Sequence, residues 1–239
     1  MLAVQNITRT FNKGKVGFKN LTFSIQKGEI IGVLGTSGCG KSTLLRVLSG
    51  LDQQFEGQYS LGDKSVGMMF QEPRLMPWLS VINNITFGAE TEKQKLLANE
   101  LIELVGLNGF ERNFPKDLSG GMAQRTAIAR SLITEPDVLL LDEPFSALDA
   151  FTKMQLQDLL LSIWEERKTT MVLVTHDIDE ALYLCDRIII LRGQPGEIYA
   201  EIRIDKAKPR SRGDIQLAEK KAEILHLLDL NKERSNLHG

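Results

Sequence analysis

The sequence is poor in several features, and each shortage excludes a class of protein. Its 239 residues include only two cysteines, Cys39 and Cys185, too few for a disulfide framework. The formal net charge is −2, so no overall charge favours nucleic acid or an anionic membrane. The first residues lack a basic stretch followed by an apolar run, and no apolar string approaches the ~20 residues of a membrane-spanning helix. We therefore expect a cytoplasmic protein that meets a membrane only through a partner.

The periodicity of apolar residues changes along the chain. Residues 2–29 alternate apolar and polar positions, which is typical of antiparallel strands. The apolar runs at 29–35, 137–144 and 170–177 indicate short buried strands, and a helical segment at 153–167 separates the last two. This strand–helix–strand order predicts a parallel sheet. Residues 187–202 predict a hairpin that turns at Pro195–Gly196.

The segment from about 72 to 135 has helical periodicity and no buried-strand run. It predicts a helical lobe inserted into an α/β core. We expect one large domain over residues 1–205, followed by a short polar and helical C-terminal tail over residues 206–239.

Residues 35–43, GTSGCGKST, fit the phosphate-binding pattern G-x-x-x-x-G-K-[ST] completely. Its backbone N–H groups wrap phosphates, Lys41 reaches the outer phosphates and the Ser42 hydroxyl faces Mg²⁺. A buried strand before it and an amphipathic helix after it favour this interpretation over a chance glycine-rich turn. The expected nucleotide-binding residues are Gly35, Thr36, Ser37, Gly38, Cys39, Gly40, Lys41, Ser42 and Thr43.

Two strand ends carry side chains suited to hydrolysis. Asp142 and Glu143 close the strand in VLLLDEP; Asp142 suits the Mg²⁺ shell, and Glu143 suits a general base for the attacking water. A capping pair before the turn at Pro144 is the alternative. His176 ends the strand in MVLVTHD, where open α/β sheets bind ligands, so we expect it to polarise or orient the γ-phosphate region. A lone histidine is otherwise a structural residue.

Two further features leave alternatives open. Phe11 could stack on adenine or pack in the core. LSGGMAQR, residues 118–125, predicts a helix capped by Ser119, whose N–H groups and dipole suit a second anion. That site could close on the nucleotide by folding back within one chain or by pairing across two chains, and the spacing does not choose between them.

The chain contains, in this order, GTSGCGKST, Gln71 in FQEP, LSGGMAQR, VLLLDEP, SALD and His176 in VTHD. This ordered set resembles the nucleotide-binding subunits of ATP-binding-cassette (ABC) transporters, over residues 2 to about 200. The resemblance implies an α/β fold: a P-loop NTPase core with a mixed sheet, an N-terminal antiparallel β part and an inserted helical lobe. It implies an ATPase that uses ATP and Mg²⁺ and pairs head-to-tail with a second cassette subunit, a homodimer being expected. Each ATP would lie between one P-loop and the partner's signature residues Ser119, Gly120, Gly121 and Met122.

The resemblance also implies roles for single residues. Gln71 would join Ser42 and Asp142 around Mg²⁺ and relay to the membrane subunit, acting in catalysis with Lys41, Glu143 and His176. Phe11 matches the adenine-stacking aromatic, and Met122 replaces a glutamine often found at the fifth signature position. The loop expected to cross the dimer interface comprises Ser146, Ala147, Leu148 and Asp149.

Residues 68–88 resemble the importer subfamily for nitrate, aliphatic sulfonates and taurine. This implies integral membrane permease partners, an extracytoplasmic solute-binding protein as an indirect partner, no nucleic acid, and a peripheral position at the cytoplasmic side of the cell membrane. An exporter cassette is one alternative. An ATP-gated DNA-repair clamp is another, although residues 44–117 are too few for its long coiled coil. A GTPase or small-molecule kinase is a further alternative; the chain lacks the N-K-x-D segment that reads guanine, and nucleotide preference in competition binding would decide.

Overall fold

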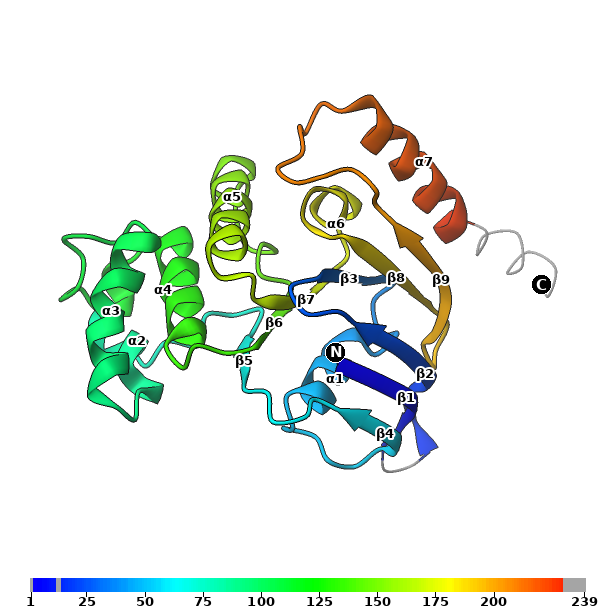
Figure 1. Cartoon of the computed structure of the whole chain (residues 1–239), viewed down its shortest axis with the longest axis horizontal. Helices are drawn as coiled ribbons and strands as arrows, with labels where there is room; N and C mark the ends of the chain where they lie inside the picture. The colour runs from blue at the N-terminus through cyan, green and yellow to red at the C-terminus, as the bar shows by residue number, and fades with distance from the viewer. Residues whose placement is uncertain (1, 12–13, 230–239) are drawn as a thin grey trace.

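The computed structural model describes residues 2–11 and 14–229, which form two sheets and a helical lobe (Figure 1). The larger sheet has the order β5-β6-β7-β3-β8-β9, in which only β9 runs antiparallel to its neighbour. The smaller sheet is antiparallel, with the order β2-β1-β4. The strands are β1 (Leu2–Thr10), β2 (Val16–Ile25), β3 (Ile30–Gly35), β4 (Glu56–Ser60), β5 (Val66–Met69), β6 (Val138–Asp142), β7 (Thr170–Thr175), β8 (Arg187–Arg192) and β9 (Glu197–Arg203).

The larger sheet is buried on both faces, which is why its strands read as continuous apolar runs. Ile31 and Val33 of β3 face a core shared with α1 (Lys41–Leu48) and the smaller sheet. Ile30 and Leu34 face the opposite core, beneath α5 (Ala150–Arg167) and α6 (Ile178–Leu184). Helix α1 therefore lies between the two sheets, and α5 and α6 cover the other face.

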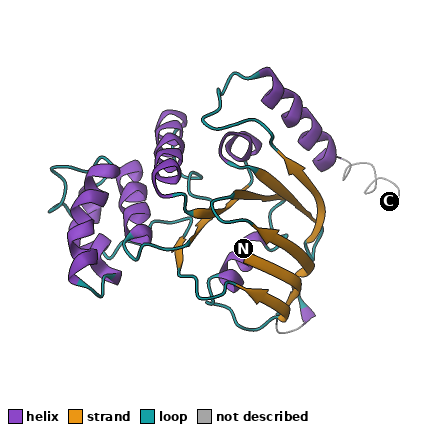
Figure 2. Ribbon diagram, viewed as in Figure 1, coloured by secondary structure: helices purple, strands orange, loops and turns teal. Residues whose placement is uncertain are grey.

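The inserted lobe is helical, as the periodicity predicts, and no strand occurs between residues 71 and 136, all of which the structure describes. It projects from the sheet beyond β5 and β6 (Figures 1 and 2). Its helices are α2 (Val81–Ile85), η2 (Thr86–Gly88), α3 (Glu92–Leu104), η3 (Pro115–Asp117) and α4 (Gly120–Leu132). Helix α4 begins after Ser119, whose hydroxyl accepts a hydrogen bond from the Met122 N–H at 3.2 Å. The predicted fold class and this cap are confirmed.

The strands β4 and β5 are absent from the sequence-based prediction. They contain five and four residues, and β4 is mostly exposed. Neither presents a buried-strand run of its own, because each is an edge strand whose pairing partner is distant in sequence. Their positions depend on β1 and β6.

The segment after β9 packs on the core before α7 (Ile215–Asp229) begins. Arg210 is 4% exposed and donates hydrogen bonds to the carbonyl oxygens of Leu182 and Cys185, each at 2.7 Å, at the end of α6. The Lys208 ammonium lies 3.6 Å from the ring centroid of Trp164. The first residues of the expected tail thus cap α6 with a buried cation. No helix within residues 2–11 and 14–229 is long and apolar enough to cross a membrane.

Arg210→Met should lower the free energy of unfolding by about 2–4 kcal/mol, because it leaves several buried carbonyl oxygens without their charged donor. Urea unfolding followed by circular dichroism measures this loss. Arg203→Met, at an exposed position of β9, is the matched control and should change stability by less than about 0.5 kcal/mol. A loss below about 1 kcal/mol for Arg210→Met would contradict the capping role.

Candidate functional site

Three strands of the larger sheet end side by side. In the parallel pairing Leu34 of β3 lies opposite Thr175 of β7, and Asp142 of β6 lies opposite Val174. The residues that follow these strands therefore meet at one sheet edge, the position where open α/β sheets bind ligands. They are the phosphate-binding loop, Glu143 and His176.

The loop at residues 35–43 curves around its own lysine. Gly38 and Gly40 have φ values of 83° and 92°, a left-handed conformation that favours glycine. A Cβ on Gly40 would also lie 2.5 Å from the carbonyl oxygen of Gly17 in β2. The Lys41 ammonium donates to the carbonyl oxygens of Gly35, at 2.8 Å, and Thr36, at 3.2 Å. A cation is thus held across the loop opening.

A buried carboxylate lies beneath the loop. The Ser42 hydroxyl donates to Asp142 Oδ1 at 2.9 Å, and Asp142 is 8% exposed. Desolvation raises the pKa of Asp142, the Ser42 hydrogen bond acts in the opposite direction, and the neighbouring Glu143 charge adds to the increase. Mg²⁺ commonly takes one or two protein oxygens and completes its shell with phosphate and water. Ser42 and Asp142 fit that requirement.

Glu143 and His176 form a pair that the sequence does not predict. His176 Nδ1 lies 3.1 Å from Glu143 Oε2, and the His176 side chain is 62% exposed. Glu143 has a φ of 46°, an unfavourable conformation for a residue with a Cβ, which costs about 1–2 kcal/mol. Its N–H donates to the Val174 carbonyl at 2.9 Å, and this contact holds the strained turn in place. Strain of this kind is common at functional sites.

A hollow of about 570 Å³ is lined by ten of the predicted site residues, whereas Gly35, Thr36, Cys39 and Asp142 are not among its lining residues. It also contains Lys15 and Gly17, which the sequence analysis missed; their signal was proximity to Phe11 across one hairpin turn. Cys39 is fully buried, and desolvation raises the pKa of its thiol, so its side chain faces the core. The lining residues are Phe11, Lys15, Gly17, Ser37, Gly38, Gly40, Lys41, Ser42, Thr43, Gln71, Glu143 and His176.

The signature residues do not line this hollow. Ser119 and Gly120 are exposed at the start of α4, whereas Gly121 is buried. A Cβ on Gly121 would lie 2.5 Å from Thr152 Cγ2 of α5, so this glycine permits close helix packing within the chain. Thr152 in turn donates its N–H to Asp149, the cap of α5, at 3.0 Å. The signature and the 146–149 loop form one packed unit with an exposed Ser119–Gly120 edge.

Gln71 connects this unit to the hollow. Its Nε2 donates to Ser146 Oγ at 3.3 Å, and its backbone carbonyl accepts from Gln124 Nε2 of α4 at 3.1 Å. Gln124 is buried in the lobe. Gln71 therefore contacts the hollow, the 146–149 loop and the signature helix at once.

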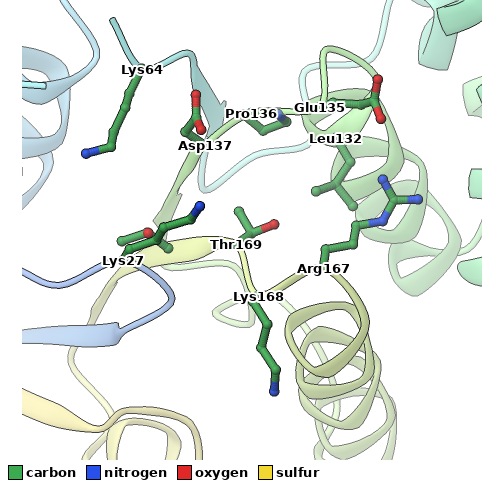
Figure 3. Close-up of a pocket in the computed structure, with 10 residues that line it drawn as sticks. Lys27, Lys64, Leu132, Glu135, Pro136, Asp137, Arg167, Lys168 and Thr169 are labelled. Atoms are coloured by element: carbon green, nitrogen blue, oxygen red, sulfur yellow. The ribbon is translucent and has the colours of Figure 1, made fainter. Parts of the chain in front are cut away.

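Two other hollows contain few of the predicted residues. One of about 400 Å³ lies where β6 and β7 begin, with Lys27, Lys64, Asp137 and Arg167 among its lining residues (Figure 3). A larger one of about 900 Å³ lies among α5, α6 and the start of α7; of the predicted residues, only Leu148 lines it. Size alone does not identify the functional site in this protein.

Comparisons with known proteins agree with the geometry. Residues 18–146 match the family described as ABC transporter. The aliphatic sulfonates import ATP-binding protein SsuB 2 of Pseudomonas syringae pv. tomato is 52% identical over 212 residues, which cover 89% of this chain and 91% of that protein. The aliphatic sulfonates import ATP-binding protein SsuB of Bacillus cereus is 45% identical, with 94% of each chain covered. The ATP-binding cassette MJ0796, in a dimeric post-hydrolysis state bound to ADP and Pi, has a TM-score of 0.74 and 32% identity, over 88% of this chain and 100% of that one.

Asp142→Asn should raise the melting temperature of the ligand-free protein at neutral pH and remove the extra stabilisation that Mg²⁺ adds to ADP binding. The pKa of this carboxyl is higher in the folded than in the unfolded chain, so the group destabilises the fold when the pH lies above its pKa in the unfolded chain. This cost disappears as the pH falls through the folded pKa, so the advantage of asparagine should fade in acid. Melting curves between pH 4 and 8, with ADP and with or without Mg²⁺, test both effects.

The matched control is Asp137→Asn, an exposed carboxyl at the opposite end of β6. It should leave the Mg²⁺-dependent stabilisation intact. Full retention of that stabilisation in Asp142→Asn would contradict the assignment of Asp142 to the ion.

Proposed function

The chain belongs to the ABC transporter family, and from that premise we propose that it is the ATP-hydrolysing subunit of an importer for aliphatic sulfonates. The observation that carries the proposal is the single hollow shared by the phosphate-binding loop, Gln71, Glu143 and His176. The solute rests on the names of the relatives, because the ATPase subunit does not touch it.

Binding would use the whole length of the hollow. The base would stack on Phe11, the loop N–H groups would surround the phosphates, and Lys41 would turn from the Gly35 and Thr36 carbonyls toward the outer phosphates. Ser42, Asp142 and Gln71 would hold Mg²⁺. That ion supplies charge neutralisation on the phosphate oxygens when it is bound.

Hydrolysis would use the pair at the ends of β6 and β7. Glu143 accepts a proton from the water that attacks the γ-phosphate, so that ATP and water give ADP and phosphate. His176, 3.1 Å from Glu143, holds the carboxylate in place and presents its ring toward the γ-phosphate end of the hollow. The left-handed backbone at Glu143 belongs to the turn that places its carboxylate beside His176.

A second cassette subunit would complete the site. Ser119 and Gly120 are exposed and lie outside the hollow of their own chain, which supports the two-chain alternative over folding back. In a head-to-tail dimer they would cap the partner's γ-phosphate with the N-terminus of α4. The 146–149 loop, packed against the same helix start, would then lie at the dimer interface.

The permease would contact the lobe beside Gln71. Trp78 is 69% exposed, whereas Met76 is half-buried and its N–H donates to Asn84 Oδ1 at 2.8 Å. Arg130 of α4 holds the Arg74 carbonyl at 2.9 Å, so this segment moves with the signature helix. We place the permease contact on Trp78, at the cytoplasmic side of the membrane, with a solute-binding protein acting from the other side. An importer is favoured over an exporter or a DNA-repair clamp because the relatives are import proteins.

Glu143→Gln should bind ATP, lose about 10²-fold or more of its hydrolysis rate, and accumulate as a dimer with ATP. A ligand shared by two subunits favours their association until it is hydrolysed. Size-exclusion chromatography with and without ATP, together with phosphate release, measures the outcome. A monomer at saturating ATP would count against the shared site.

Two variants in the same background separate binding from dimerisation. Ser119→Arg should keep ATP binding yet stay monomeric, because a long side chain blocks the partner's phosphate. Lys41→Ala should lose ATP affinity itself, since it removes the cation of the loop. If Ser119→Arg also abolishes binding to the monomer, the signature acts on its own nucleotide.

Trp78→Ser should retain ATP hydrolysis in solution but reduce transport about tenfold or more, since an exposed tryptophan is a frequent interface anchor. Uptake of radiolabelled ethanesulfonate by cells that express the complete importer measures transport. Leu51→Ser, an exposed apolar residue outside the lobe, is the matched control and should support normal uptake. Normal uptake with Trp78→Ser would move the permease contact elsewhere.

A further inference from the structure

Arg9 of β1 lies beside the Phe11 ring in an unusual setting. Its guanidinium carbon is 4.4 Å from the ring centroid, and the residue is 7% exposed. Its Nε donates to Asp52 Oδ2 at 2.7 Å, and Nη2 donates to Gln54 Oε1 at 3.3 Å. Nη1 donates to the Thr10 carbonyl. Arg9 is thus fixed by its own partners before any ligand binds.

The Phe11 ring is enclosed on two sides. Arg9 covers one face, and a Cβ on Gly17 would lie 2.9 Å from Phe11 Cε2, so the hairpin backbone abuts the ring edge. Phe11 lines the nucleotide hollow, whereas Arg9 does not. The ring surface that faces the hollow is therefore the one that the guanidinium leaves uncovered.

Arg9 also ties the ring to the phosphate-binding loop. Asp52 follows α1, and its N–H donates to the Arg46 carbonyl of that helix at 3.0 Å. Helix α1 begins at Lys41, directly after the loop glycines. Desolvation opposes ionisation of Asp52, but the hydrogen bonds from Arg9 and the Gln54 N–H and the charges of Arg9 and Arg46 together lower the pKa of this carboxyl, so the ion pair persists at neutral pH.

We propose that Arg9 is a positioning residue for the nucleotide base: its guanidinium packs on one face of the Phe11 ring and presents the other face for stacking. The chemistry it serves is recognition of a purine base rather than of phosphate. A ring already fixed against a cation loses less conformational freedom when the base stacks on it. The inference rests on the proposed function, because it requires Phe11 to contact the base.

The test measures ADP dissociation constants by calorimetry together with kcat and KM for ATP. Arg9→Met should weaken ADP binding and raise KM for ATP by about 3- to 30-fold, the range of a desolvated cation–π contact, while kcat stays within about twofold. Arg9→Lys keeps a cation near both the ring and Asp52, so it should recover most of that loss. An Arg9→Met protein with unchanged ADP affinity would overturn the inference.

A double variant shows whether Arg9 acts through the ring. In the Phe11→Leu background, Arg9→Met should add less than about a twofold loss, because the surface that it orients is gone. A general folding defect would instead persist in that background, and additive losses would overturn the inference. If Phe11→Leu binds ADP as tightly as the unaltered chain, the proposed role of Phe11 in binding the base is wrong. That result is distinct from a failure of the inference about Arg9.

Arg212→Met is the matched control. Arg212 also pairs with a carboxylate, Asp158 at 2.6 Å, and packs 3.9 Å from an aromatic centroid, that of Tyr183. None of these three residues lines the nucleotide hollow. This variant should leave ADP affinity and KM unchanged, and a loss equal to that of Arg9→Met would show that the Arg9 effect is not specific to the base site.

Discussion

The parallel pairing of β6, β7 and β3 is the constraint on which the site depends. It places the ends of three strands from distant parts of the chain within reach of one another, with Asp142 opposite Val174 and Leu34 opposite Thr175. A slip of one residue would turn Asp142 to the other face of the sheet and break its hydrogen bond with Ser42. Because both faces of these strands are apolar, the fit of their side chains into the two cores sets this register, rather than an alternation of apolar and polar residues.

The chain carries two separate surfaces, to which the proposed function assigns different nucleotides. One is the hollow; the other is the exposed edge of Ser119 and Gly120, held in place by the packing of Gly121 on Thr152. Gln71 touches both the hollow and the 146–149 loop, and its backbone also holds Gln124 of the signature helix. Gln71 alone therefore links the hollow to both the 146–149 loop and the signature helix.

The C-terminal segment stabilises the side of the site that carries His176. Helix α6 starts just after that histidine, and Lys153 of α5 pairs with Asp177 at 3.1 Å and with Glu180 at 2.8 Å near its start. Arg210 caps the far end of the same helix. Cations thus contact both ends of the helix that follows His176. The first residues after β9 thus support the ATPase core.

The sequence alone determined the features whose chemistry is local. Neighbouring residues are enough to identify the loop GTSGCGKST, the acids of VLLLDEP and the helix start at Ser119. Apolar runs are enough to predict the buried strands. Only the tertiary structure decided the features that depend on distant partners. They are the edge strands β4 and β5, the ion pair of Arg9 with Asp52, 43 positions away, and the contact of Glu143 with His176. The structure also shows that the signature residues do not line the hollow of their own chain. The reason is physical, because side-chain pairing across elements depends on strand order and register, which no short segment encodes by itself.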